Sequence, residues 1–242
     1  MVTYKIISRT GSRPVNEDCT GMHQKGDDYG FFLADGLGGH GKGDVASKTA
    51  VEQAILQFEA GGSTPETMKG VFEAGQAAVM EQQRLAGNSQ GMKTTMTAVL
   101  INNQCIQWGH IGDSRIYYFQ NDKLICRTFD HSVPQMLVAA GEIKEKEIRH
   151  HPDRNRLLRV MGIEQETVPF QMAEPVERRG RQAFLLCSDG FWELIDEKEM
   201  TTLLRKAHSV EKWLDDMEAL VLKHGAGTNM DNYSAVAVWV EA

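Results

Sequence analysis

Short connections between strand-like segments restrict the fold of this chain more than any other feature. Residues 95–101 form a predicted strand, and apolar and polar residues alternate again over residues 106–110, after a turn at Asn102-Asn103. Residues 116–119 and 123–126 are predicted to form a second hairpin. Connections of this length leave no room for crossover helices between parallel strands. The central part of the chain is therefore predicted to form an antiparallel sheet.

Further strands and several helices surround this region. Strands are predicted at residues 2–7, 29–34, 183–187 and 233–240, and helices at 51–58, 68–79, 133–140 and 210–221. Between the first two helices, Thr64 is a predicted helix cap and Pro65 a predicted first helical residue. Helix pairs separated by antiparallel strands pack best in layers. The predicted fold class is α+β, a four-layer α-β-β-α sandwich in which two antiparallel sheets face each other and helices flank them.

Composition narrows the possible functions. A chain of 242 residues is predicted to form one domain, residues 1–242. Its formal net charge of −7 gives no electrostatic attraction to nucleic acid or to an anionic membrane, so neither is an expected partner. No secretory signal and no apolar stretch of about 20 residues is visible, so we expect a cytoplasmic protein. The four cysteines lack a C-x-x-C spacing, which favours free, buried thiols over a zinc site.

Four aspartates occupy the same kind of position, where a strand ends or a glycine turn begins. They are Asp35, Asp113, Asp189 and Asp231. Each one alone would be explained as a turn former or a helix cap. Together they suggest that several carboxylates converge at one rim of a sheet, where their mutual repulsion requires cations. Hard oxygen donors without a neighbouring Cys or His pair favour Mg²⁺ or Mn²⁺.

Two other motifs overlap the first of these aspartates. Residues 36–41 fit G-x-G-x-x-G, the dinucleotide-binding pattern, but helix, turn and helix follow instead of a parallel strand with an acidic end. Residues 36–43 fit most of a nucleotide-binding P-loop, but Gly43 replaces the Ser or Thr that binds Mg²⁺. The glycines are better explained as letting the backbone approach an ion beside Asp35.

A charged segment near the N-terminus, residues 13–18, adds a second candidate group. Arg13 offers a planar guanidinium that suits a phosphate dianion. Glu17 and Asp18 offer oxygens that accept hydrogen bonds from metal-bound water. Taken alone, this segment would be explained as a charged loop after an edge strand.

Eight segments form an ordered series along nearly the whole chain. They are RPVNED (13–18), ADGLGGHGKGDVAS (34–47), TTMTAVLI (94–101), WGHIGDSRIYYF (108–119), DHSVPQMLVAAGEI (130–143), HPDRNRLLRVMG (151–162), LLCSDGFWELI (185–195) and DNYSAVAV (231–238). In this order they resemble the bacterial branch of the PP2C-type (PPM family) Ser/Thr protein phosphatases. One such motif is weak evidence, whereas eight in register are specific. The resemblance implies a β-sandwich flanked by helices, in agreement with the layers predicted above.

The resemblance also implies roles for the metal-binding residues. Asp35 is expected to bridge two Mn²⁺ or Mg²⁺ ions, one of which also binds the Gly36 carbonyl. Asp189 and Asp231 are expected to bind the other ion. Asp113, together with Asp189, is the expected ligand of a weaker third ion.

Further roles are implied for the residues around these ions. Glu17 and Asp18 are expected to act through waters, and Arg13 to hold the substrate phosphate. A hydroxide that bridges two ions about 4 Å apart is expected to attack phosphorus in line, so that no Ser or Cys nucleophile is required. The leaving seryl or threonyl oxygen needs a proton, either from His40 or from a metal-bound water. His40 is explained equally well as a loop residue that faces solvent.

Three positions depart from the family pattern. Lys93 stands where Gly usually precedes the paired threonines, and Ser234 stands where Thr is more usual. Leu37 replaces the His that follows the metal-binding Asp-Gly in eukaryotic members, so His40 does not simply inherit that role. Residues 132–162 resemble the mobile flap that borders the site in bacterial members. Its basic residues would meet a phosphopeptide or form a solvated surface: His150, His151, Arg154, Arg156 and Arg159.

The sequence thus predicts a monomeric enzyme that hydrolyses phosphoserine and phosphothreonine in proteins and opposes a bacterial Ser/Thr kinase. Two alternatives come from other classes of function. An inactive relative would act as a binding or scaffold module, which the loss of a metal-binding aspartate would favour; none is lost. A nucleotide-binding switch would be built on residues 36–43, which tight ATP or GTP binding would favour.

Overall fold

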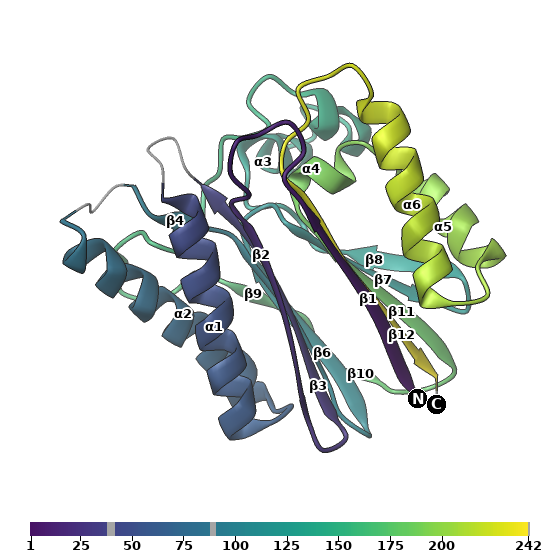
Figure 1. Ribbon diagram of the computed structural model, residues 1–242, viewed down its shortest axis with the longest axis horizontal. Helices are drawn as coiled ribbons and strands as arrows, with labels where there is room; N and C mark the ends of the chain where they lie inside the picture. The colour runs from purple at the N-terminus through teal and green to yellow at the C-terminus, as the bar shows by residue number, and fades with distance from the viewer. Residues whose placement is uncertain (38–41, 88–90, 242) are drawn as a thin grey trace.

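Two antiparallel sheets lie face to face in the computed structural model, which describes residues 1–37, 42–87 and 91–241 (Figure 1). The first sheet has the order β1 (Val2–Arg9), β12 (Tyr233–Glu241), β11 (Arg181–Cys187), β7 (Arg115–Gln120) and β8 (Lys123–Arg127). The second has the order β10 (Val176–Glu177), β6 (Cys105–Ile111), β5 (Met96–Ile101), β3 (Asp28–Leu37) and β2 (Asp18–Lys25). The short strands β4 (Lys93–Thr94) and β9 (Gln171–Met172) pair with β3 and β6.

Helices cover the outer face of each sheet (Figure 1). Helices α1 (Gly43–Gly61) and α2 (Pro65–Leu85) pack on the second sheet, whereas α5 (Glu197–Lys206) and α6 (Val210–Gly225) pack on the first. Three shorter helices lie near one end of the sandwich: α3 (Val133–Ala139), the 3-10 helix η1 (Glu145–His150) and α4 (Asp189–Trp192). This arrangement confirms the predicted four-layer α+β fold with antiparallel sheets.

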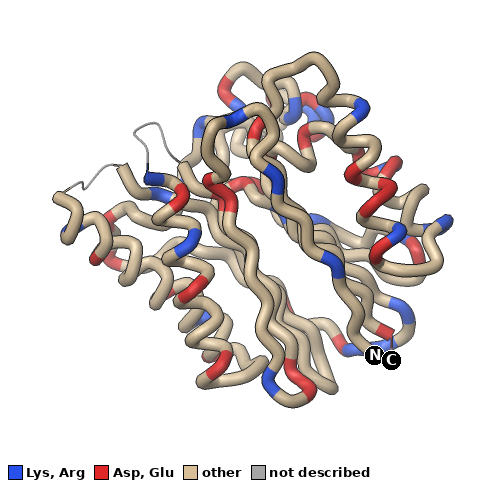
Figure 2. Tube along the Cα trace, viewed as in Figure 1, with Lys and Arg blue, Asp and Glu red and all other residues tan. Residues whose placement is uncertain are grey.

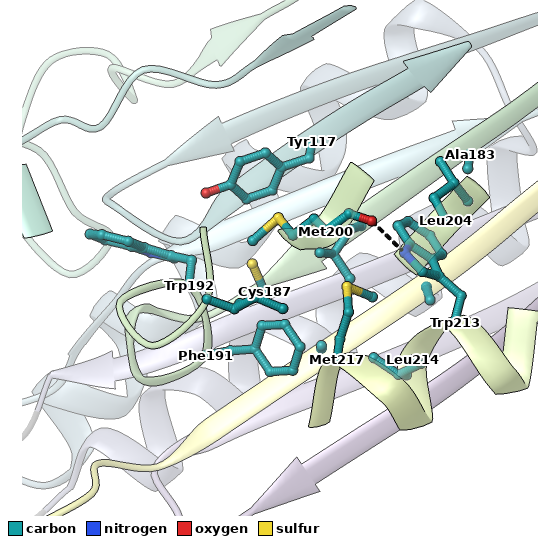
Figure 3. Packing of buried hydrophobic residues seen from close by; sticks show 14 of the residues in the cluster. Tyr117, Ala183, Cys187, Phe191, Trp192, Met200, Leu204, Trp213, Leu214 and Met217 are labelled. Carbon is teal, nitrogen blue, oxygen red and sulfur yellow. Dashed lines mark hydrogen bonds between the residues drawn. The ribbon is translucent and has the colours of Figure 1, made fainter. Parts of the chain in front are cut away.

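The buried apolar side chains form one layer between the sheets and one layer under each pair of helices. Phe31, Val99, Phe184 and Val238 belong to the layer between the sheets. Figure 3 shows the layer under α5 and α6, where the Trp213 indole nitrogen donates to the Met200 carbonyl over 3.1 Å. Burial of these apolar layers is the main favourable contribution to folding, about 25 cal/mol for each Å² removed from water.

Several local predictions can now be compared with the structure. The Thr64 hydroxyl accepts a hydrogen bond from the Thr67 backbone and Pro65 begins α2, as predicted. The sequence analysis missed β2, because its polar residues resemble a loop until β3 pairs with them, and it missed α5. Among the cysteines, Cys187 is buried but Cys126 is exposed, so the prediction of buried thiols was wrong for the latter. No helix within the described ranges is long and apolar enough to cross a membrane.

Candidate active site

Along the strands, the residues that face the layer between the sheets are apolar over most of the length and polar at one end of the sandwich. On β3, Phe31 and Leu33 face this layer, and Asp35 is the next residue on the same face. On β12, Val236 faces the layer and Ser234 precedes it on that face. The polar end lies away from the two chain termini (Figure 1). Strand alternation therefore delivers polar groups from both sheets to one place.

The backbone around Asp35 is fixed on both sides. Asp18 on β2 is its register partner, so the two carboxylates lie on the same face of neighbouring strands. The Asp35 backbone N–H donates to the Thr95 hydroxyl over 2.9 Å, and its carbonyl accepts from the Thr94 hydroxyl over 2.8 Å. β3 continues past Asp35 to Leu37, where Gly36 pairs with Thr94. The prediction that the strand ends at Asp35 was therefore wrong by two residues.

A pocket of about 520 Å³ opens at this polar end. Six of the residues predicted for the site line it together with Gly36: Arg13, Glu17, Asp35, Asp113, Asp189 and Asp231. Asp18 does not line the pocket and is buried beside Asp35 on β2, with 8% of its surface exposed. His40 lies outside the described residues. The aspartates that the sequence placed at four separate strand ends thus converge on one pocket.

Ser188 connects the two sheets beneath this pocket. It directly precedes α4, which begins at Asp189, and its hydroxyl donates to the Asp18 carboxylate over 2.7 Å. The same hydroxyl accepts from the Ser234 backbone N–H over 3.0 Å. Gly190 has no room for a side chain, because a Cβ there would lie 2.1 Å from the Asn232 carbonyl oxygen. These contacts hold Asp189 against the segment that carries Asp231.

Asn232 is a site residue whose role the sequence analysis did not identify. Its amide oxygen accepts from the Glu17 backbone over 2.8 Å, and its amide nitrogen donates to the Thr10 and Val15 carbonyls. It thereby fixes the loop that carries Glu17. The sequence signal that could have identified Asn232 was its position directly after Asp231.

Arg13 and Asp231 form an ion pair at the mouth of the pocket. The Arg13 Nη2 atom lies 2.8 Å from Asp231 Oδ2, and 46% and 39% of the two side chains are exposed. A pair this exposed adds at most about 1 kcal/mol to stability. The guanidinium therefore keeps the freedom to exchange this carboxylate for another anion.

Burial and mutual repulsion raise the pKa values of the pocket carboxylates. The pKa of Asp35 lies well above its usual value, first because of burial and then because of Asp18. Burial, followed by Asp189, does the same to the pKa of Asp113, and burial raises the pKa of Asp18 to about 7. Burial also raises the pKa of Glu17. A site with these shifts disfavours negative charge unless a cation compensates it.

The donor set of the pocket fits hard divalent cations. Its ligand atoms are carboxylate oxygens, and buried Asp18 Oδ1 has no hydrogen-bond partner in the described part of the chain. An orphaned carboxylate oxygen beside repelling carboxylates indicates a place for a cation or its water. Among residues 1–37, 42–87 and 91–241, no three His, Cys, Asp or Glu side chains already have an arrangement that could hold a metal ion.

A buried network lies behind Asp113. The Trp192 indole nitrogen donates to the Asp113 carbonyl over 3.1 Å, and the Arg115 guanidinium lies 3.4 Å from the centre of the Trp192 ring. Arg115 also makes two hydrogen bonds, of 2.8 and 2.7 Å, to the Asp130 carboxylate. The Thr95 hydroxyl, which holds Asp35, lies 2.7 Å from the Ser114 hydroxyl. Asp113 and Asp35 are therefore held by one connected scaffold.

The predicted flap meets the pocket through only part of its length. Asn155 and Leu157 line the pocket, and the sequence analysis named neither. Arg154 bonds to Glu193 over 2.8 Å, whereas His150 and His151 line a separate hollow. Burial and Asp189 raise the pKa of Glu193 to about 7. The basic flap residues thus do not converge on the carboxylate pocket.

The two nucleotide-binding motifs do not form their expected structures. A dinucleotide-binding unit requires parallel strands, and β3 pairs antiparallel with β2, β4 and β5. The Gly36 backbone N–H donates to the Glu17 carbonyl over 3.0 Å, so it is not free to bind a phosphate as in a P-loop. Lys93 on β4 pairs with Leu37, which places it one residue from the partner of Gly36.

In Figure 2, acidic positions occur where strands and loops meet at this end of the sandwich. Comparisons with known proteins identify the family of this chain. The profile of the family described as protein phosphatase 2C matches residues 8–232. The chain is 31% identical to the serine/threonine phosphatase stp of Listeria welshimeri over 228 residues, covering 89% of this chain and 87% of that protein.

Solved structures show the same fold. The serine/threonine phosphatase Stp1 from Staphylococcus aureus superposes with a TM-score of 0.88 at 26% identity, covering 100% of this chain and 96% of that chain. The catalytic domain of the phosphatase PstP in complex with two manganese ions gives a TM-score of 0.81 at 27% identity, covering 100% and 99%. The profile match and these similarities show that the chain belongs to the protein phosphatase 2C family.

Proposed function

We propose that this chain hydrolyses phosphoserine and phosphothreonine in proteins with the help of divalent metal ions. The observation that carries the proposal is the convergence of Asp35, Asp189 and Asp231 with Arg13 around one pocket. Family membership supports the reaction class, because the relatives named above are serine/threonine phosphatases. The manganese ions of the PstP structure support the choice of cation.

The carboxylates of this chain would hold the ions. Asp35 and the Gly36 carbonyl would bind one ion, with Asp35, Asp189 and Asp231 binding a second, and Asp113 and Asp189 would bind a weaker third. Glu17 and Asp18 would accept hydrogen bonds from water around them. Two divalent ions supply the activation of water near neutral pH and the neutralisation of phosphoryl charge.

Arg13 would bind and orient the substrate phosphate. Its guanidinium presents parallel N–H donors that match two phosphoryl oxygens. Its present partner, Asp231, is a proposed metal ligand, so ion binding would engage that carboxylate and release the guanidinium. The substrate phosphate would then replace Asp231 as the anion paired with Arg13.

Hydrolysis forms a P–O bond to water and breaks the P–O bond to the seryl or threonyl oxygen. The departing oxygen takes a proton, for which His40 and a water remain the two candidates predicted from the sequence. No side-chain nucleophile takes part, so Cys187, which is buried, has no part in the reaction. Leu157 and Asn155 would limit access of bulk water from the flap side of the pocket.

The wider setting of the enzyme is part of the same proposal. Residues 1–242 would act as one catalytic unit, since the family profile spans 8–232 and both sheets contribute to the site. The enzyme would work as a monomer on phosphoproteins that a Ser/Thr kinase produces. Size-exclusion chromatography with light scattering would test the monomer.

Phosphate release from a phosphothreonine peptide tests the function directly. We expect turnover with Mn²⁺, none with EDTA, and a loss on the order of 100-fold or more in Asp189→Asn, because even residues that only support metal ligands contribute about 10–100-fold. Asp215→Asn makes the same change on the exposed surface of α6 and serves as the control. Failure of folded wild-type protein to turn over the peptide with any divalent ion would instead favour a binding module.

A further inference from the structure

Two hydrogen bonds join His131 to Gly112, the residue directly before Asp113. Its ring Nδ1 atom accepts a hydrogen bond of 3.2 Å from the Gly112 backbone N–H. Its own backbone N–H donates to the Gly112 carbonyl over 2.9 Å. Gly112 has a φ of +102°, and a Cβ there would lie 2.5 Å from the Thr95 side chain, so this turn accepts only glycine. One residue thus clamps the turn that carries Asp113.

The same residue holds the segment that borders the pocket. The His131 carbonyl accepts a hydrogen bond of 2.7 Å from the Leu158 backbone N–H. Its neighbour Ser132 forms an antiparallel bridge with Leu157, which lines the pocket. The Val133 backbone N–H donates to the Arg156 carbonyl over 2.9 Å. The chain around His131 therefore bonds to the Asp113 turn on one side and to residues 156–158 on the other.

Neighbouring contacts keep this connection rigid. The His131 ring stacks on the His110 ring with a centroid separation of 4.6 Å and an angle of 16°. Asp130, directly before it, is bonded to buried Arg115 by two hydrogen bonds. Because Nδ1 accepts the Gly112 N–H, the proton of the neutral ring lies on Nε2. Both flanks and the ring itself are thus fixed in one orientation.

We propose that His131 is a positioning residue that sets the place of Asp113 and couples it to the pocket border at Leu157 and Leu158. This inference rests on the proposed function, in which Asp113 binds an ion. An ion that draws Asp113 into place would move Gly112, then His131, and then the border residues. Binding at the metal site and the shape of the substrate entrance would change together.

Two substitutions separate the hydrogen bond from the bulk of the ring. His131→Leu fills the space without an acceptor, whereas the amide oxygen of His131→Asn can replace Nδ1. Calorimetric titration with Mn²⁺ should show the weakest site about 10-fold weaker in His131→Leu, in line with the usual cost of losing a residue that supports a ligand. His131→Asn should stay within about 2-fold of wild type, since a supporting hydrogen bond is retained.

His23→Leu is the matched control, because it removes an imidazole from β2, where the ring packs edge-on against Phe58. Kinetics with a phosphothreonine peptide at subsaturating Mn²⁺ should rank the variants as the titration does. His131→Leu should have a lower kcat and a higher KM than His131→Asn and wild type. Wild-type Mn²⁺ binding in folded His131→Leu would overturn the proposal. Lack of turnover in wild type would count against the proposed function alone, since calorimetry does not require turnover.

A measurement on the wild-type protein keeps the proposal testable if His131→Leu does not fold. Nitrogen-15 NMR of the imidazole should show the proton on Nε2. During titration with Mg²⁺, the amide signals of Gly112 and Leu158 should shift with the same midpoint. A proton on Nδ1, or a Leu158 amide that does not move while that of Gly112 shifts, would overturn the coupling.

Discussion

The two sides of the pocket are built in different ways. On the inner side, Asp113 is 6% exposed and stands in front of the Arg115–Asp130 pair, whose side chains are each 1% exposed. On the outer side, the Arg13 and Asp231 side chains are 46% and 39% exposed and pair with each other, and Asp231 also accepts a hydrogen bond of 2.8 Å from the Asn232 backbone N–H. We refer to these as the inner wall and the outer rim. The inner wall is held by many buried hydrogen bonds, whereas the Arg13 side chain of the outer rim is held by an exchangeable ion pair.

This difference separates the support of Asp113 from the binding of phosphate by Arg13, whereas Asp231 belongs to the outer rim and is also a proposed metal ligand. A metal ligand has to keep its position, which favours a buried and fully bonded support. A phosphate-binding group has to release one anion and accept another, which favours an exposed and weak ion pair. The comparison therefore predicts that substitutions in the inner wall mainly lower stability, whereas substitutions in the outer rim mainly lower catalytic activity.

The largest effect is expected at the inner wall. Arg115→Met should lower the free energy of unfolding by about 3–5 kcal/mol, because buried Asp130 would lose both hydrogen bonds from Arg115 and keep only the longer, 3.5 Å contact with Arg127. Arg179→Met, which removes an exposed pair with Glu177, should cost at most about 1 kcal/mol. Urea denaturation of both variants gives the comparison. Equal losses in the two would show that the inner wall has no special role in stability.

A pH-dependent effect is expected where the flap meets α4. Burial and Asp189 raise the pKa of Glu193 from 4.5 to about 7. The folded state therefore holds a proton that the unfolded state has released, so this contribution to stability is present below pH 4.5 and is lost as the pH rises through 7. Relative to wild type, Glu193→Gln should become more stable by up to about 3 kcal/mol between pH 4.5 and pH 8.

Urea denaturation in EDTA at several pH values measures this difference. Glu174→Gln, on the exposed surface, is the control and should follow wild type across the range. A constant difference between Glu193→Gln and wild type would contradict the raised pKa. The experiment sharpens the comparison because Glu193 bonds to Arg154 of the flap and directly follows Trp192, which donates to the Asp113 carbonyl.

The outer rim should show the reverse pattern. Arg13→Ala should reduce kcat/KM for a phosphothreonine peptide by about 10–100-fold, the equivalent of about 1.5–3 kcal/mol for hydrogen bonds to a charged group. Its free energy of unfolding should change by less than about 1 kcal/mol. The kcat/KM of Arg13→Lys should fall between those of wild type and Arg13→Ala, since lysine keeps the positive charge but lacks the paired donors. A large stability loss with unchanged kcat/KM would remove the distinction between wall and rim.

The sequence predicted the scaffold better than the support of the site. Strand alternation and short turns were enough for the antiparallel layers, because each of these signals is local. Asp35, Asp113, Asp189 and Asp231 could be grouped because each follows a strand or precedes one. Their convergence on one pocket, which the structure shows, required only that both sheets end at the same place.

The supporting residues could not be predicted in the same way. Arg115 and Asp130 are 15 positions apart, and Trp192 reaches Asp113 from 79 positions away. Such contacts depend on how the sheets and α4 pack, which no local pattern records. β2 illustrates the same limit, because its half-buried polar residues become a strand only through pairing with β3. The role of His40 stays a prediction, since it lies outside the described residues.

The closeness of the two chain ends has a practical consequence. β1 and β12 are neighbours from Val2 and Val240 onward, and the Met1 amino group donates to the Glu241 carbonyl. Both ends lie at the opposite end of the sheets from the pocket (Figure 1). A fluorescent protein, an immobilisation tag or a targeting module joined at either end would leave the entrance free. A short linker between the ends would allow the chain to be opened elsewhere, as a circular permutant that keeps both sheets.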